Sequence, residues 1–254
     1  MTRKILFLGQ KPIGEKCFDI LLNERCETLE ICGAVSNITE NKWWKSARIF
    51  EQSKKNNIPF ISNEVRNNEQ ILELIKKEGI NTIISVQHEW ILPGKILEAV
   101  KGSAFNLHMA KLPEYKGYNT FSFAIINGDK DYTTTIHMMA EDVDAGDIVI
   151  EESVSIASDE TAQTLYEKVS NVSIACFCKL VDLLKRNKPV PARPMSGESR
   201  FYSRNDLEKI KNITDFSDLK KVGRIVRACT FSGFEPAYFS SGGIKYYITG
   251  RQHG

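Results

Sequence analysis

The sequence has few of the features that are typical of a membrane-bound or disulfide-stabilised protein. Its 254 residues contain six cysteines at irregular spacings and no Cys-x-x-Cys pair, so we expect reduced thiols rather than a disulfide framework. The apolar run Ile5–Leu8 is too short for a signal-peptide core or a membrane span. We therefore expect a cytoplasmic protein with no membrane partner.

The sequence also has no large excess of charge of either sign. Lys and Arg number 34 and Asp and Glu number 32, which leaves a net charge of +2. This surplus is too small for a protein that mainly binds a nucleic-acid backbone. Hydrophobic residues make up 42% and charged residues 26% of the chain, a composition that excludes a disordered chain, a collagen and a coiled coil. A globular protein with a sizeable core is expected.

Short apolar runs alternate with amphipathic segments in the first part of the chain. The expected strands cover residues 3–9, 28–36, 58–61, 81–86 and 103–108, and the expected helices cover 15–23, 44–56 and 67–78. Such alternation is typical of a Rossmann-like α/β fold, a mostly parallel sheet with helices on both faces. Two further extended runs, 133–139 and 148–156, predict an antiparallel addition to the sheet.

A long helix and a proline-rich segment divide the chain. The helix is expected from Thr161 to about Leu184, and the prolines that follow end it. We therefore predict a main domain over residues 1–188 and a C-terminal appendage over 195–254. The appendage is expected to contain a short helix near 219–229 and a β-hairpin that turns at a Gly-containing segment.

The loop after the first expected strand lies where sheets of this kind bind ligands, outside the carboxyl ends of their strands. It reads Gly9-Gln10-Lys11-Pro12-Ile13-Gly14, and the amides at the start of a helix there suit phosphate. However, the dinucleotide fingerprint G-x-G-x-x-G is missing, and the chain contains no P-loop. The sequence therefore disfavours a dinucleotide cofactor.

Two polar side chains share a face of the strand 103–108. Asn106 and His108 are two residues apart, so strand alternation puts both on one side of the sheet. A histidine that stands alone in an apolar strand is more often a satisfied core residue. The polar loop 111–119 that follows is in the usual place for a site in this architecture, which favours a functional role.

An acidic loop separates the two antiparallel strands. Residues 141–147 contain four carboxylates but lack the spacing of a calcium loop, and no zinc-like spacing of Cys or His accompanies them. We therefore expect no metal. A carboxylate that orients a histidine is the better use of this loop.

These segments together resemble a known enzyme family. Asn106-x-His108, the loop Leu112-Pro113-x-Tyr115-x-Gly117, and Asp144 within Val143–Asp147 are similar to the signature of the formyltetrahydrofolate-dependent formyltransferases. The resemblance covers about residues 3–185, and the greatest likeness is to the nucleotide-sugar N-formyltransferases. Ser85–Pro93 resembles the folate-binding loop of that family.

The resemblance implies roles for particular residues. His108 would donate a hydrogen bond to the oxyanion of the tetrahedral intermediate, and Asn106 would donate another or fix the donor. Asp144 would orient and charge-balance His108, and would accept or relay the proton of the amine. The residues implied to bind the co-substrate N10-formyltetrahydrofolate are Gln87, His88, Trp90, Ile91, Leu92, Ala140 and Glu141. The residues implied to bind the acceptor are Gly9, Gln10, Lys11, Met109, Tyr115, Gly117 and Asn119. His88 could instead belong to the loop structure, and His137 is expected to be structural.

The resemblance leaves several acceptors open. The tail of the chain resembles that of sugar N-formyltransferases, which implies a dTDP-linked deoxyamino sugar, a role in O-antigen and lipopolysaccharide synthesis, and a homodimer through the C-terminal hairpin. The alternatives are an enzyme like methionyl-tRNA formyltransferase and a non-catalytic folate- or nucleotide-binding module.

Residues 200–230 carry eight Lys and Arg against four Asp and Glu, but a solvated helix face explains this surplus more simply than nucleic acid. Trp43 and Trp44 could contact a base or pack over a loop. The residues do not distinguish a 3-amino from a 4-amino sugar, nor dTDP from UDP.

Overall fold

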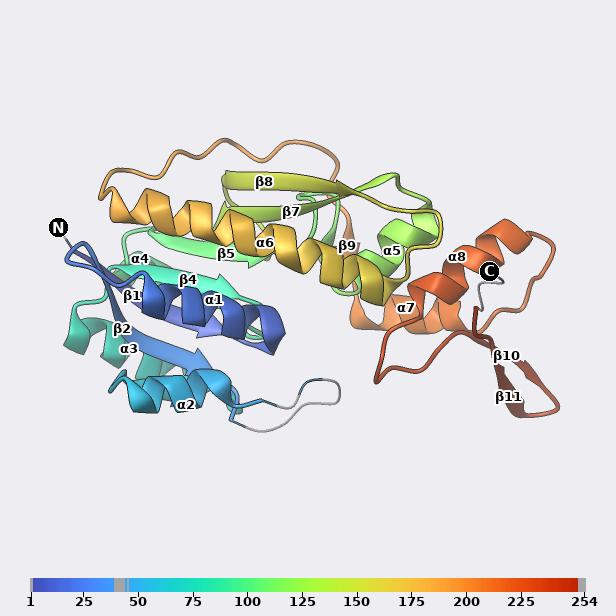
Figure 1. The fold of residues 1–254 in the computed structure, drawn as a ribbon, viewed down its shortest axis with the longest axis horizontal. Coiled ribbons are helices and arrows are strands. Elements are labelled where there is room, and N and C mark those ends of the chain that lie inside the picture. The colour runs from blue at the N-terminus through green and yellow to red at the C-terminus, as the bar shows by residue number, and fades with distance from the viewer. Residues whose placement is uncertain (1, 39–43, 45, 251–254) are drawn as a thin grey trace.

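A seven-stranded sheet forms the centre of the protein (Figure 1). The structure is a computed structural model that describes residues 2–38, 44 and 46–250. The order of the strands across the sheet is β3-β2-β1-β4-β5-β7-β8. Their bounds are β1 Arg3–Gly9, β2 Leu29–Ser36, β3 Phe60–Ser62, β4 Thr82–Val86, β5 Ala104–His108, β7 Asp131–Met138 and β8 Ile148–Ser155. The first five strands are parallel, whereas β7 and β8 run antiparallel to their neighbours.

Helices cover both faces of this sheet. Their bounds are α1 Lys11–Asn23, α2 Arg48–Lys55, α3 Asn68–Glu78, α4 Gly94–Ala99, α5 Thr120–Asn127, α6 Ala162–Lys185, α7 Arg204–Lys211 and α8 Leu219–Ala228. Strand β1 is apolar on both sides because it is central: Ile5 and Phe7 join the core cluster formed with α1, α2 and α6, and Leu6 and Leu8 join the cluster formed with α3 and α4. All four side chains are fully buried, and each such burial stabilises the fold by about 2 kcal/mol.

The longest helix, α6, begins at a capping box and ends near the prolines. The Thr161 side chain accepts a hydrogen bond from the Thr164 amide, and the Thr164 side chain accepts one from the Thr161 amide. These bonds satisfy two of the amides that a helix start leaves unpaired. Buried residues three and four apart, such as Val169, Ser173, Cys176 and Leu180, then face the sheet.

The direction of chain progression across the sheet reverses between β1 and β4. Strands β2 and β3 lie on one side of β1 and strands β4 and β5 on the other, with Gly9 beside Val86 at the carboxyl ends. Sheets of this topology bind ligands in this position. The residues that follow β1, β4 and β5 are therefore brought to one end of the sheet.

The C-terminal segment packs against α5 and α6 rather than standing alone. The Ser122 hydroxyl donates to the Ala228 carbonyl at 2.7 Å, and Arg224 Nε donates to the Ile126 carbonyl at 3.0 Å. Leu207 and Ile225 belong to the same apolar cluster as the sheet. The hairpin β10 Tyr238–Ser241 and β11 Ile244–Tyr247 lies beyond these helices, far from the sheet (Figure 1).

The expected fold class is confirmed, with differences at several boundaries. The helix expected over 15–23 begins at Lys11, because a proline in the first helical turn needs no backbone donor. The helix expected over 44–56 covers only Arg48–Lys55. The unexpected elements are the short helices α4, α5 and α7 and the two-residue strands β6 Lys116–Gly117 and β9 Phe201–Tyr202. Such short elements carry too little periodicity to be recognised.

Two parts of the predicted organisation lie partly outside the described residues. Trp44 is buried, but Trp43 lies outside the described residues, as do positions 251–254 of the expected appendage. Within the described part of the chain, no helix is long and apolar enough to cross a membrane. The division at residues 188 and 195 stays a prediction.

Candidate active site

Asn106 and His108 lie on one side of β5, as strand alternation predicts, while Leu107 between them is buried on the other side. The antiparallel register of β5 and β7 puts His137 directly opposite Asn106. Asn106 Nδ2 lies 3.1 Å from His137 Nε2. A histidine expected to be structural therefore contacts the amide of a candidate catalytic residue. The polar residues Thr133, Thr135 and His137 occupy alternate positions of β7. This alternation could have indicated that His137 lies on the polar side of the strand.

The His108 ring lies between a carbonyl and a carboxylate. Its Nε2 is 2.7 Å from the Tyr115 carbonyl oxygen, which can only accept, so Nε2 carries a hydrogen and donates it. Its Nδ1 is 3.5 Å from Asp144 Oδ1. The other oxygen of this carboxylate, Oδ2, accepts a hydrogen bond from the Gly117 amide at 3.1 Å. The side chains of His108 and Asp144 are 12% and 11% exposed, so water screens their interaction weakly.

His137 is held as a neutral ring beside this pair. Its Nδ1 lies 2.7 Å from the Met138 carbonyl and 3.2 Å from the Ala145 carbonyl, so Nδ1 carries the hydrogen. Burial lowers the pKa of His137, and the nearby His108 lowers it further. The bare Nε2 then accepts the Asn106 amide hydrogen, which determines how the Asn106 side chain is turned. This contact is a structural reason for a histidine at position 137.

The three predicted catalytic residues are thus brought together, although they come from two different segments. Asn106 and His108 come from β5, and Asp144 comes from the loop between β7 and β8. An amide and an imidazole that face the same space are suited to donate hydrogen bonds to a developing oxyanion, and a carboxylate beside the imidazole stabilises its charged form. The arrangement is therefore suited to acyl transfer. Their catalytic roles stay proposals.

A second polar group lies at the carboxyl ends of β1 and β4, next to the first. Lys11 Nζ donates to Gln87 Oε1 at 2.7 Å, and both residues have left-handed backbones, with φ of 63° and 59°. Burial lowers the pKa of Lys11; the nearby Glu89 raises it and Arg204 lowers it. Left-handed residues other than glycine are uncommon, and their occurrence is a reason to look for a functional role.

Two neighbouring polar side chains have no hydrogen-bond partner among the described residues. Gln10 is 1% exposed and neither its amide nitrogen nor its oxygen is paired, and both ring nitrogens of His88 are buried and unpaired. Burial lowers the pKa of His88 to about 4. Buried polar atoms without a hydrogen bond lower the stability of a folded protein. Their presence at this end of the sheet therefore indicates a position where a polar ligand can supply the missing hydrogen bonds.

The predicted folate-binding residues form a neighbouring, partly apolar surface. Trp90 is 39% exposed and donates its indole hydrogen to the Asn63 carbonyl at 3.0 Å. Ile91 is 54% exposed, whereas Leu92 is buried. Glu141 reaches this loop, since its carboxylate lies where a side chain on Gly94 would stand. The two predicted groups, residues 87–92 and 140–141, are thus brought together.

The remaining predicted acceptor residues differ in their accessibility. Met109 is buried in the core, and the Tyr115 hydroxyl is turned to Asp129 and Asn127 rather than to His108. Asn119 occupies the N-cap position of α5, but its side chain makes no capping hydrogen bond and donates instead to the Arg204 carbonyl at 3.5 Å. Arg204, which the sequence did not indicate, also lies over the Tyr118 ring at 4.5 Å. Of the predicted acceptor residues, those best placed to contact a ligand beside the two polar groups are Gly9, Gln10, Lys11 and Gly117.

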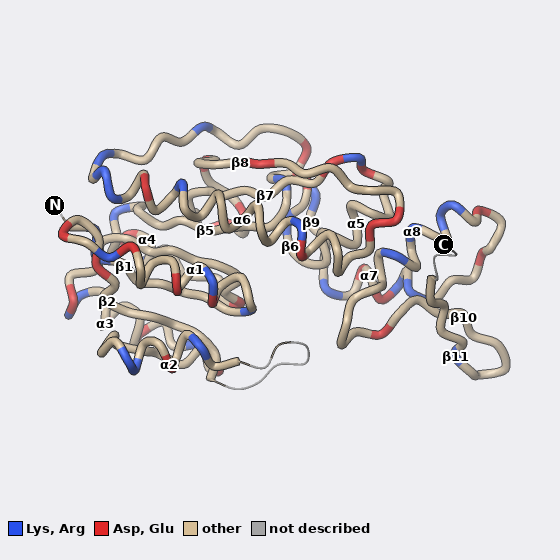
Figure 2. Tube along the Cα trace, viewed as in Figure 1, with Lys and Arg blue, Asp and Glu red and all other residues tan. Residues whose placement is uncertain are grey.

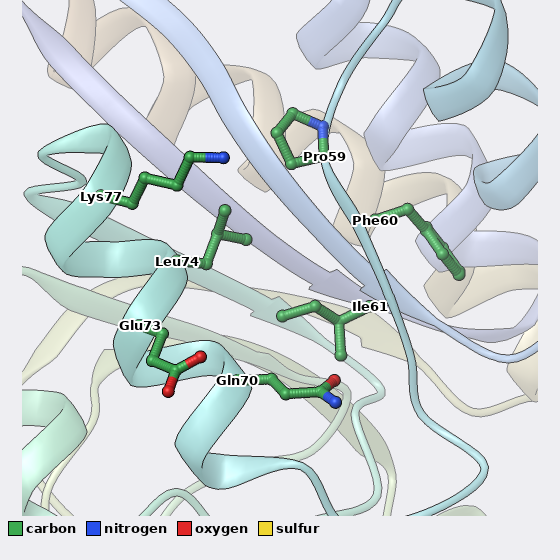
Figure 3. A pocket seen from close by; sticks show the side chains of 7 residues that line it. All are labelled: Pro59, Phe60, Ile61, Gln70, Glu73, Leu74 and Lys77. Carbon is green, nitrogen blue, oxygen red and sulfur yellow. The ribbon is translucent and has the colours of Figure 1, made fainter.

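A hollow elsewhere on the surface is unrelated to this site. It has a volume of about 280 Å³ and lies between β3 and α3, at the edge of the sheet (Figure 3). It is lined by Pro59, Phe60, Ile61, Gln70, Glu73, Leu74 and Lys77, none of which belongs to the two polar groups. Within the described residues, no cluster of three or more His, Cys, Asp or Glu side chains could hold a metal ion.

Comparison with known proteins identifies a family. The profile of the formyl transferase family matches residues 3–181. GDP-perosamine N-formyltransferase of Brucella melitensis biotype 1 is 27% identical over 245 residues, which are 96% of this chain and 92% of that protein. Methionyl-tRNA formyltransferase of Caldanaerobacter subterraneus subsp. tengcongensis is 31% identical over 137 residues, but these are only 54% of this chain and 44% of that protein.

Solved structures share the fold over nearly the whole chain. A 4-N formyltransferase from Francisella tularensis has a TM-score of 0.82 at 21% identity. The superposition covers 99% of this chain and 98% of that one. An N-formyltransferase from Helicobacter canadensis, in complex with folinic acid and dTDP-3-aminofucose, has a TM-score of 0.76 at 21% identity, with coverages of 96% and 86%. The similarity therefore includes the C-terminal segment as well as the sheet.

Proposed function

Because this chain belongs to the formyl transferase family and is a formyltransferase, we propose that it formylates the amine of a dTDP-linked deoxyamino sugar, a 3- or 4-amino-dideoxyhexose. The formyl donor is N10-formyltetrahydrofolate. The observation that carries the proposal is the contact of His108 with Asp144 beside Asn106. The product would serve the synthesis of a surface polysaccharide such as an O-antigen.

The proposed reaction uses these three residues without a covalent enzyme intermediate. The amine nitrogen of the sugar attacks the formyl carbon, and the formyl oxygen becomes an oxyanion. Asn106 Nδ2 stabilises it with the amide hydrogen that it does not donate to His137, and His108 stabilises it by redirecting its Nε2 hydrogen from the Tyr115 carbonyl to the oxyanion. Asp144 lies beside His108; it accepts the proton that the amine loses. The bond from the formyl carbon to N10 then breaks, and N10 takes up the proton that Asp144 holds as the tetrahydrofolate leaves, which restores the Asp144 carboxylate.

The second polar group is proposed to bind the two substrates. The pterin of the donor would lie against residues 87–92 and 140–141, where its ring atoms could pair with His88. The diphosphate of the sugar nucleotide would meet Lys11 and Gln10 near the start of α1, where unpaired amides and a lysine favour negative charge. Both substrates would then approach His108 from the carboxyl end of the sheet.

The sugar acceptor is favoured over tRNA by two observations. The match to GDP-perosamine N-formyltransferase covers 92% of that protein, whereas the matches to methionyl-tRNA formyltransferases cover between 44% and 77% of those proteins. In addition, acidic residues alternate with the basic residues of α7 (Figure 2), where Lys209 pairs with Asp206 and Lys211 with Glu208. These pairs reduce the positive charge that an RNA backbone would require.

A direct assay tests the proposal. Purified protein is incubated with N10-formyltetrahydrofolate and each of a panel of dTDP-, UDP- and GDP-linked 3-amino and 4-amino sugars, and product masses are measured by liquid chromatography and mass spectrometry. We expect one formyl group to be added to a dTDP-linked member. Formylation of charged initiator tRNA instead would favour the alternative enzyme, and ligand binding without turnover would favour a binding module.

Variants test the roles of the residues. Replacing Asn106, His108 or Asp144 by alanine is expected to lower kcat by roughly a hundredfold or more, since each contributes to oxyanion or proton handling. Asp142→Ala, an exposed carboxylate of the same loop, is the matched control and is expected to keep its activity. Lys11→Met is expected to raise KM for the sugar nucleotide, with the exposed Lys16→Met as its control.

The hairpin offers an apolar surface for the proposed homodimer. Seven large apolar side chains among the described residues of the C-terminal segment are 45 to 72% exposed, the last three of them on the hairpin: Phe201, Phe216, Leu219, Phe234, Ile244, Tyr246 and Tyr247. A cluster of exposed apolar side chains is typical of a protein interface. We expect light scattering to give twice the mass of one chain, and Ile244→Asp to give the monomer. A monomeric parent protein would refute this part of the proposal.

A further inference from the structure

The loop 113–118 holds both outer contacts of the His108 and Asp144 pair. The Tyr115 carbonyl accepts the His108 Nε2 hydrogen at 2.7 Å, and the Gly117 amide donates to Asp144 at 3.1 Å. These two backbone groups are two residues apart. A shift of this loop would therefore turn the imidazole and move the carboxylate together.

The same loop is held from its other side by the C-terminal segment. Strands β6 and β9 pair in parallel, separately from the main sheet, with Gly117 beside Tyr202. The Lys116 amide donates to the Arg200 carbonyl at 3.0 Å, and the Tyr118 amide donates to the Tyr202 carbonyl at 2.9 Å. The Arg200 amide in turn donates to the Pro113 carbonyl at 3.2 Å. Residues 200–202 thus bind the loop by three backbone hydrogen bonds.

The Tyr202 side chain adds a packed contact beneath the loop. Its ring is stacked on Phe123, with ring centroids 4.1 Å apart, and on Tyr115, with centroids 5.6 Å apart. Its hydroxyl accepts a hydrogen bond from Asn127 Nδ2 at 3.3 Å. Most of this contact is between ring faces, since the hydrogen bond is long.

Gly117 allows the two strands to approach closely. Its φ is 88°, and a Cβ atom there would lie 2.4 Å from the Tyr202 carbonyl oxygen. A side chain could be accommodated only if β9 moved away from the loop. The short distance between the C-terminal segment and the site thus depends on a glycine at this position.

We propose that residues 200–202, and the Tyr202 ring above all, are a positioning element for catalysis: they hold loop 113–118 where it orients His108 and Asp144. The C-terminal segment then acts on the chemical step from outside the reacting groups, in addition to any role in assembly. This proposal rests on the proposed catalytic roles of His108 and Asp144.

The test compares three variants in the complete chain. Tyr202→Ala removes the ring and is expected to lower kcat by roughly tenfold to a hundredfold with KM for both substrates little changed, because a displacement of about 1 Å in a catalytic group has effects of this size. Tyr202→Phe keeps the stacking and is expected to restore most of kcat. Ile210→Ala is the control, since Ile210 packs on the same apolar cluster but makes none of the described contacts with loop 113–118.

A second measurement does not depend on turnover. Nitrogen NMR of histidine-labelled protein reports which ring nitrogen of His108 carries the hydrogen and how fast it exchanges. We expect a protected Nε2 hydrogen in the parent, Tyr202→Phe and Ile210→Ala proteins, and fast exchange in Tyr202→Ala. If Tyr202→Ala matches Ile210→Ala in both kcat and the His108 signal, the proposal is wrong. If the parent protein transfers no formyl group, the proposed function fails, and the His108 signal still decides whether Tyr202 positions the ring.

Discussion

The burial of His88 predicts a loss of stability on mild acidification. Both ring nitrogens are buried without a partner, and burial lowers the pKa from 6.5 to about 4. In the unfolded chain the ring takes up a proton below about pH 6.5, whereas in the folded protein it stays neutral down to about pH 4. The unfolded state therefore binds more protons between these values, and the stability due to the neutral ring is lost as the pH falls.

The size of this effect follows from the two pKa values. The full difference of about 2.5 pH units corresponds to roughly 3 kcal/mol, and the part between about pH 7 and pH 5 is about 2 kcal/mol. In His88→Gln this contribution is missing, while every other titrating group is kept. The free energy of unfolding of the parent should thus fall by about 2 kcal/mol more than that of His88→Gln over this range.

Urea unfolding, followed by circular dichroism at several pH values, measures this difference. Titration of the histidine ring signals by NMR checks the pKa itself. Parallel stability curves for the parent and His88→Gln, or a His88 signal that titrates near pH 6.5, would refute the reasoning. Either result would mean that water or a rearranged loop reaches the ring in solution.

Three further predictions concern the core and the site. Tyr132→Phe removes the donor to the Met109 carbonyl at 2.7 Å and should lower the free energy of unfolding by about 1 to 3 kcal/mol in urea titrations; no change would mean that the carbonyl finds another donor. Phe177→Ala empties a fully buried position in α6 and should cost about 3 to 5 kcal/mol, which thermal melts would reveal as a lower Tm. Because burial lowers the pKa of Lys11, kcat/KM for the sugar nucleotide should fall at alkaline pH below 10.5, as the ammonium loses its proton, and this limb should be missing in Lys11→Met.

The paired arrangement of Asn106 and His108 followed directly from the sequence. Strand alternation alone puts residues two apart on one side, and the alternation of β5 is unambiguous because Leu107 is apolar. The order of the longer strands and helices was predictable for the same reason, since each of these elements carries its own periodicity. The exposed hairpin was also visible, because a glycine-containing turn lies between two alternating runs.

The contacts of His137 and of the C-terminal segment were not predictable in this way. Whether His137 lies opposite Asn106 depends on the register between β5 and β7, which turn geometry and packing determine together. The pairing of Gly117 with Tyr202 joins residues far apart along the chain through strands of only two residues each. No local pattern marks such a pairing.

The sequence by itself therefore determined the fold class, the two polar residues of β5, and the loops that lie at the carboxyl ends of the strands. These depend on periodicities of two and 3.6 residues, which each segment expresses locally. Only the tertiary structure decided that His137 contacts Asn106 and that residues 200–202 pair with loop 113–118. The family resemblance implied that Asp144 orients His108, but the distance between them depends on the tertiary structure. Such contacts arise where separate segments pack against one another, and their distances depend on the register and packing of the whole core.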